Sequence, residues 1–187
     1  MSAGRVWWTL RTFGHDKVAV LDGGLRKWLA EGRPVTDEVA PFSRGVFKAH
    51  FNPEAVRSKA QILDNIASRA EQVIDARSAA RFTATEKEAR PGLRSGHIPG
   101  SLNLPFNALT NPQTGELLDI PSIAKAFEQA GLDLSEPVIA SCGSGVTAAA
   151  LAFGLHLAGK DDVAIYDGAW TEWGQQGDTP VETGDGK

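Results

Sequence analysis

Short apolar runs alternate with segments whose apolar residues recur every three or four positions from about residue 52 onward. The short runs predict buried strands, and the longer spacing predicts helices. Strands are predicted at 72–77, 102–104, 138–141 and 163–166, and helices at 53–67, 121–130, 148–153 and 169–176. Because strands and helices alternate, the pattern predicts an α/β fold with a parallel sheet and helices on both faces.

The first of these helices carries a start signal. Asn52 is a favoured N-cap residue, and Pro53 suits the first helical position. Val56, Ala60 and Leu63 follow at helical spacing. A helix beginning at Asn52 and Pro53 is therefore predicted.

The beginning of the chain repeats its end. Residues 18–23 (VAVLDG) align without a gap with residues 163–168 (VAIYDG), and Trp28 then falls on Trp173. Internal repeats of this kind mark repeated structural units. We therefore predict the C-terminal tail of an incomplete first unit at 1–35, a linker at 36–50 and a complete second unit at 51–187.

The predicted tail is rich in aromatic residues. Trp7, Trp8 and Phe13 would form an exposed apolar patch if nothing covered them. We expect them to pack on the second unit or on another chain.

Composition narrows the classes of function. The chain has 187 residues, a net charge of −4 and no block of Lys or Arg, so a nucleic-acid partner is not expected. The single cysteine excludes an internal disulfide and any site in which two cysteines hold a metal. No apolar run approaches a membrane span, and we expect a cytoplasmic protein without a membrane partner, a metal or another cofactor.

The one cysteine lies where a predicted strand gives way to a helix. Cys142 opens the glycine-rich loop 142–147 (CGSGVT). Such a loop can turn backbone N–H groups inward, and the following helix adds the positive end of its dipole. Both effects favour a thiolate, which is the nucleophilic form. We predict a nucleophile here, against the alternative of a small buried residue that ends a core strand.

Charged residues follow the preceding strand. Arg81 and Arg90 are candidates to bind an anionic substrate, because a planar guanidinium matches a carboxylate, although arginines are also common on surfaces. Asp75 and Arg77 end a strand and predict a buried structural ion pair. His97 lies in a Gly/Pro turn and is expected to fix that turn by hydrogen bonding rather than to act as a base.

Four motifs resemble the rhodanese superfamily in type and order. They are Asp75-Ala76-Arg77, residues 96–101 (GHIPGS), residues 142–147 (CGSGVT) and residues 166–173 (YDGAWTEW). The loop and Arg81-Phe82 resemble the 3-mercaptopyruvate sulfurtransferases of bacterial type. Members of that family usually carry two rhodanese domains in tandem, and the cysteine lies in the second.

The resemblance implies sulfur transfer. The Cys142 thiolate would take sulfur from 3-mercaptopyruvate, release pyruvate and pass the persulfide sulfur to a thiol such as thioredoxin or to cyanide. The resemblance also implies substrate-binding or anion-stabilising roles for Arg81, Arg90, Gly143, Gly145, Val146 and Thr147.

The resemblance further implies a catalytic role for Ser144, working with a His and an Asp of the first domain that are missing here. Gly143 and Ser144 stand where rhodaneses of the thiosulfate type carry basic residues. Thiosulfate is therefore the less favoured donor.

Two other classes of function compete. A phosphatase of the Cdc25 type needs an Arg after the Cys and five further residues, but Ala148 occupies that position. A catalytically weak or inactive rhodanese module with a binding or regulatory role stays open, because the first unit is incomplete.

Overall fold

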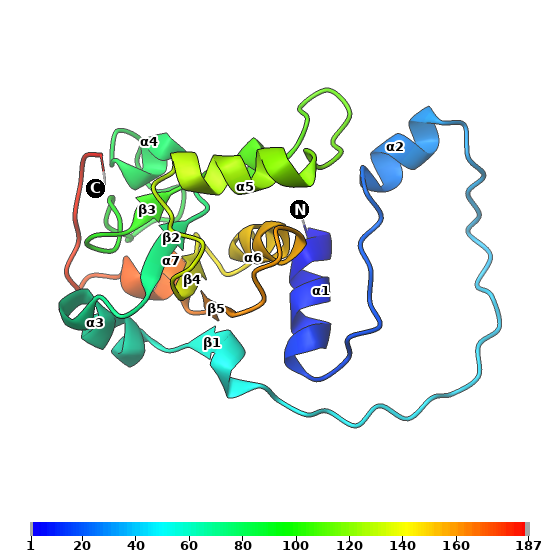
Figure 1. Cartoon of the computed structure of the whole chain (residues 1–187), viewed down its shortest axis with the longest axis horizontal. Coiled ribbons are helices and arrows are strands. Elements are labelled where there is room, and N and C mark those ends of the chain that lie inside the picture. Colours follow the sequence, from blue (N-terminus) through cyan, green and yellow to red (C-terminus); the bar gives the residue numbers. More distant parts are fainter. Residues whose placement is uncertain (1, 186–187) are drawn as a thin grey trace.

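The computed structural model describes residues 2–185 and contains one parallel sheet (Figure 1). The strands lie in the order β1-β5-β4-β2-β3, and every neighbouring pair is parallel. They are β1 (Val56–Arg57), β2 (Gln72–Asp75), β3 (Leu102–Asn103), β4 (Val138–Ser141) and β5 (Val163–Tyr166). All four predicted strands are present.

Helices connect these strands and extend beyond them. The α-helices are α1 (Ser2–Thr12), α2 (Gly24–Ala30), α3 (Lys59–Ser68), α4 (Ala79–Phe82), α5 (Ile120–Gln129), α6 (Ala148–Leu157) and α7 (Ala169–Trp173), and the 3-10 helices are η1 (Pro53–Ala55) and η2 (Phe106–Leu109). None of the helices within residues 2–185 is long and apolar enough to cross a membrane.

The sheet has a buried core on each face. Side chains that alternate along a strand point to opposite faces. Ile74 and Ala140 accordingly join a core with residues of α1, α5 and α6. Their neighbours Val73 and Ile139 join a second core with residues of α3 and α7. The predicted α/β fold with helices on both faces is therefore confirmed.

The prediction of a continuous helix from Pro53 is wrong for residues 53–57, which form a 3-10 helix and a short strand. The Asn52 side chain does accept the N–H of Glu54, but it caps only the short η1. Val56 then enters the sheet and pairs with Ile165. The long helix α3 starts after Ser58, whose hydroxyl and the Gln61 side chain form a capping box. Pairing at the sheet edge thus overrides the helical spacing at Val56.

The helix α1 packs against α6 (Figure 1). Trp7 and Trp8 are buried, and the Trp7 ring meets the Phe153 ring edge-on at a centroid distance of 4.9 Å. The prediction that these tryptophans pack on the second unit is confirmed. Phe13 is only partly covered, with 37% of its surface exposed, and lies 5.5 Å from the Phe51 ring.

The segment between α1 and β1 stands apart from the sheet only in part, because Val18 and Val20 pack against the core that includes residues of α6. Residues 31–50 are exposed throughout and arc away from the domain (Figure 1). Helix α2 buries none of its residues, although Lys27 pairs with Glu116 of the loop before α5. Residues 18–21 form no strand, whereas their repeat partners 163–166 form β5. A strand needs a neighbouring strand to satisfy its backbone, and residues 18–21 have none.

Candidate active site

Cys142 lies directly after β4, at the carboxyl edge of the sheet. β4 is flanked by β2 and β5, and sites in open parallel sheets form at this edge. The cysteine side chain is buried, and only 1% of the residue's surface is exposed. Loop 143–147 separates it from α6, as the sequence predicts.

The start of α7 holds the first two carbonyls of this loop. The Trp170 N–H donates to the Cys142 carbonyl at 2.8 Å, and the Thr171 N–H donates to the Gly143 carbonyl at 3.0 Å. The Thr171 hydroxyl donates to the same Gly143 oxygen at 2.6 Å. In a trans peptide the C=O and the next N–H point in opposite directions. The N–H groups of Gly143 and Ser144 are therefore turned away from α7.

A third carbonyl is held from α1. Arg5 Nη1 donates to the Gly145 carbonyl at 3.2 Å and also pairs with Asp167, which follows β5. Gly145 has a φ of +77°, and an added Cβ would lie 2.7 Å from Asp167 Oδ1. Glycine is therefore required at this position for both conformational and steric reasons. By the same peptide geometry, the Val146 N–H points away from Arg5.

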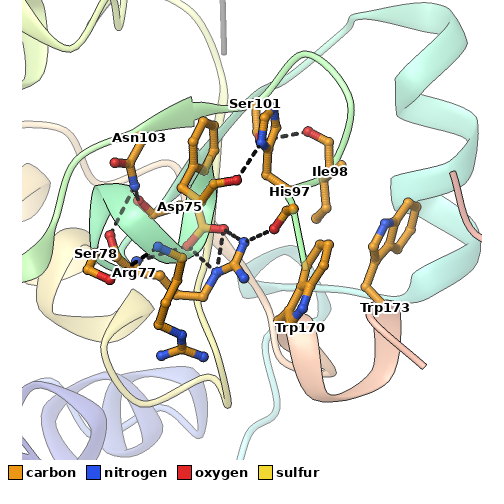
Figure 2. A network of polar contacts seen from close by, with 12 residues as sticks. Asp75, Arg77, Ser78, His97, Ile98, Ser101, Asn103, Trp170 and Trp173 are labelled. Carbon is orange, nitrogen blue, oxygen red and sulfur yellow. Dashed lines mark hydrogen bonds and ion pairs between the residues drawn. The ribbon is translucent and has the colours of Figure 1, made fainter. Parts of the chain in front are cut away.

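The predicted ion pair of Asp75 and Arg77 is present beside the loop (Figure 2). Arg77 Nη2 lies 2.7 Å from Asp75 Oδ2, and Nη1 lies 2.7 Å from Glu88 Oε1. The guanidinium also lies over the Trp170 ring, 4.3 Å from its centroid. Burial by itself lowers the pKa of Arg77, but the two carboxylates outweigh burial and raise it. Arg77 is thus a buried, paired cation.

Glu88 connects this pair to Arg81. Its second oxygen lies 2.5 Å from Arg81 Nη2, and the Glu88 side chain is 1% exposed. A Cβ on Gly143 would lie 3.2 Å from the same Arg81 nitrogen, so this guanidinium lies against the start of the cysteine loop. The sequence analysis missed Glu88. Its only signal in the sequence was its position, as an acidic residue between the two candidate arginines Arg81 and Arg90.

Arg90 reaches the loop through a hydroxyl. Its Nη1 donates to Thr171 Oγ1 at 2.7 Å, and this hydroxyl donates onward to the Gly143 carbonyl. The sequence analysis also missed Thr171, although it lies within the motif 166–173. The structure therefore brings both predicted arginines to Gly143 from different directions.

His97 lies in the turn beside this group, since the preceding residue, Gly96, accepts a hydrogen bond from Arg77 Nη2 at 2.7 Å (Figure 2). It is fully buried, its Nδ1 lies 2.9 Å from the Phe82 carbonyl oxygen, and its ring stacks on Phe82 at 3.7 Å. The geometry of His97 is that of a turn-fixing residue.

Two further candidate residues belong to the cysteine loop itself. Ser144 is exposed at the tip of the loop, and Thr147 is the N-cap of α6.

Known proteins resemble this chain over most of its length. The 3-mercaptopyruvate sulfurtransferase of Escherichia coli K12 is 45% identical over 181 residues, which cover 97% of this chain and 64% of that protein. The Thiosulfate/3-mercaptopyruvate sulfurtransferase 1, mitochondrial, of Arabidopsis thaliana is 43% identical over 203 residues, covering 97% of this chain and 53% of that protein. This chain thus spans less than two thirds of either relative.

A solved structure agrees with the sequence matches. The crystal structure of SseA from Escherichia coli, described as having the rhodanese fold of 3-mercaptopyruvate sulfotransferases, has a TM-score of 0.78 and 43% identity. The similarity covers 90% of this chain and 62% of that one. Residues 58–176, which include the sheet from β2 to β5 and the Cys142 loop, match the Rhodanese-like domain. The chain belongs to the rhodanese family.

Proposed function

We propose that this chain is a sulfurtransferase that moves sulfur from 3-mercaptopyruvate, through a Cys142 persulfide, to an acceptor thiol or cyanide. The observation that carries the proposal is the loop around Cys142, whose Cys142, Gly143 and Gly145 carbonyls accept hydrogen bonds from Trp170, Thr171 and Arg5. The following N–H groups are then free to face a sulfur anion. The names of relatives at 43–45% identity support the same chemistry.

The proposed reaction has two steps. The Cys142 thiolate attacks the donor sulfur, and the carbon–sulfur bond breaks with its electron pair going to pyruvate as the enolate. The enolate takes up a proton, and Cys142 is left as a persulfide. An acceptor thiolate then attacks the outer sulfur and regenerates the Cys142 thiolate. Ser144, which is exposed in the loop, would assist the proton transfer.

The two arginines supply the proposed substrate contacts. Arg81 and Arg90 approach the loop at Gly143, where a carboxylate and a carbonyl would bind. Glu88 neutralises part of the Arg81 charge, and Gly143 and Ser144 add none. This balance favours a monocarboxylate over a dianion. Thiosulfate is the second candidate donor, because the Arabidopsis relative carries both substrates in its name.

We also propose that a further rhodanese unit covers residues 18–30, as expected for the tail of a first unit. Leu25 aligns with Trp170 in the internal repeat, yet Leu25 is 63% exposed and Trp170 is 1% exposed. Such a unit would give residues 18–21 a neighbouring strand. It could also supply the basic partner for Ser144. A thioredoxin-like acceptor and a cytoplasmic location complete the proposal.

The test is the intact mass of the protein after incubation with 3-mercaptopyruvate or thiosulfate, with Cys142→Ser as the matched control. A gain of one sulfur atom with 3-mercaptopyruvate that is absent in the variant supports the proposal. A gain with thiosulfate alone would show that thiosulfate, and not 3-mercaptopyruvate, is the sulfur donor.

No gain with either donor contradicts activity of this chain by itself. Adding an N-terminal rhodanese fragment of a relative then separates the remaining explanations. Restored transfer supports the further unit, and continued inactivity favours a binding or regulatory module.

A further inference from the structure

Hydrogen bonds hold the cysteine loop from two sides, one through the start of α7 and the other through a side chain of α1. The Cys142 and Gly143 carbonyls accept backbone N–H groups of α7, and the Thr171 hydroxyl adds a second hydrogen bond to the Gly143 oxygen. The Gly145 carbonyl instead accepts from the Arg5 side chain. Arg5 lies 140 residues away in the sequence, on the helix that packs beside α6 (Figure 1). One side chain therefore holds the middle of the loop.

Arg5 is itself fixed by two contacts. Its guanidinium pairs with Asp167 and lies over the Trp8 ring, 4.6 Å from the ring centroid. Trp8 is buried in the core that α1 shares with α6, so the stem of Arg5 starts from an anchored position. Its side chain remains 29% exposed. The contacts restrict Arg5 to a geometry that reaches Gly145.

Holding the Gly145 carbonyl has a consequence on the opposite side of the peptide. The Val146 N–H points away from Arg5, and Gly145 adopts a φ of +77° that leaves this peptide free to rotate if released. A released peptide could turn its carbonyl oxygen toward the cysteine side of the loop. An oxygen there would repel a sulfur anion instead of stabilising it.

We propose that Arg5 is a positioning residue for the Cys142 loop. By holding the Gly145 carbonyl outward, it keeps the Val146 N–H directed to the side where negative charge resides on sulfur. The inference deepens the proposed function and rests on Cys142 as its nucleophile. It makes α1 a part of the active-site framework as well as a cover for the core.

The test compares Arg5→Gln and Arg5→Lys with Arg11→Gln. Arg11 lies on the same helix over Trp7, and its ion pairs are long, 3.9 Å to Asp16 and to Asp161. Two measurements need no sulfur donor. One is hydrogen exchange of peptides covering 143–147 and of α1, followed by mass spectrometry. The other is the pH midpoint of alkylation of Cys142, the only cysteine, by iodoacetamide.

Arg5→Gln is expected to speed exchange in 143–147 about tenfold, the loss of one charge-assisted hydrogen bond. It should also raise the alkylation midpoint by about half a pH unit, because a stabilised thiolate loses one donor. Arg81, Glu88 and Arg90 keep their partners in every variant, whereas Asp167 loses its cationic partner in Arg5→Gln. The alkylation midpoint is measured at low salt and at 0.5 M KCl. Salt screens the effect of losing the Arg5 charge, so a shift that persists at 0.5 M KCl comes from the lost donor.

Arg5→Lys keeps the charge and one donor, so it should give intermediate values, and Arg11→Gln should match the unmodified chain. Faster exchange confined to α1, or an unchanged midpoint in Arg5→Gln, would overturn the proposal. If Arg5→Gln does not fold, the Lys variant decides, and wild-type values in it overturn the proposal. If the Arg5 variants give the expected results but the chain transfers no sulfur, only the proposed function is rejected.

Discussion

A single buried carboxylate organises the cations beside the cysteine. Glu88 gives one oxygen to Arg77 and the other to Arg81, and its side chain is 1% exposed. Arg77 has Asp75 as a second partner, whereas Arg81 contacts only Glu88 among the carboxylates of residues 2–185. Loss of Glu88 would therefore release Arg81 first, while Arg77 would stay in place.

Glu88→Gln is expected to lower the free energy of unfolding by about 2 kcal/mol, the range of hydrogen bonds to charged groups. Under the proposed function it should also raise the KM for 3-mercaptopyruvate about tenfold with a smaller change in kcat, because Arg81 loses its orientation. Urea unfolding and steady-state kinetics measure the two effects.

The control for this prediction is Glu86→Gln, since Glu86 lies in the same segment and is exposed. It should behave as the unmodified chain. A Glu88→Gln variant that loses stability but keeps its KM would show that Glu88 supports the fold without placing Arg81.

At the scale of elements, α1 is the part of the N-terminal segment that contacts the site. Its buried side carries Trp7 and Trp8 against α6, and its loop-facing Arg5 contacts the chain after Cys142. Helix α6 begins directly after the cysteine loop. Packing of α1 thus bears on the helix that follows the cysteine loop.

Trp7→Ala is expected to lower the free energy of unfolding by about 3–5 kcal/mol, the usual cost of removing a buried aromatic side chain. Trp7 loses its contacts with the Phe153 ring at 4.9 Å and the His156 ring at 5.0 Å. Chemical denaturation followed by circular dichroism measures the change.

Val6→Ala is the matched control, because Val6 is the neighbouring residue and is 56% exposed. It should alter stability by less than about 0.5 kcal/mol. Equal effects of the two substitutions would contradict the packing of α1 on α6.

At the scale of the whole molecule, the chain consists of a packed sheet domain and a long exposed connection. Residues 31–50 make no helix or strand and are exposed throughout. Val39, Phe42 and Val46 in this stretch are each at least 85% exposed. Apolar side chains exposed to this extent are available for contact with the further unit that is proposed to cover residues 18–30.

Brief digestion with trypsin is expected to cut first after Arg44 or Lys48, since exposed backbone without secondary structure is cleaved most readily. Mass spectrometry of the early fragments identifies the sites. Arg44→Gln and Lys48→Gln together should remove the early cuts from this stretch, because Pro34 follows Arg33 and protects that bond from trypsin. First cuts within 58–176 would contradict the described arrangement.

Local patterns in the sequence determined much of this protein. The alternation of strands and helices, the glycine-rich loop at Cys142 and the pairing of Asp75 with Arg77 all depend on residues close together in the chain. Steric limits and hydrophobic periodicity act over that range, so they can be recognised without coordinates. Arg81 and Arg90 were candidates from their residue type and position, and the family resemblance added the substrate-binding roles that it implies for them.

Only the tertiary structure decided the contacts that join distant segments. Val56 follows the helical spacing, yet it lies in β1 because β5 offers it a partner more than 100 residues later. Arg5 reaches Gly145 across 140 residues, and Arg90 reaches Thr171 across 81. Long side chains on different elements meet only when the sheet sets their separation and direction. No local pattern carries that information, which is why Glu88, Thr171 and Arg5 emerged only from the fold.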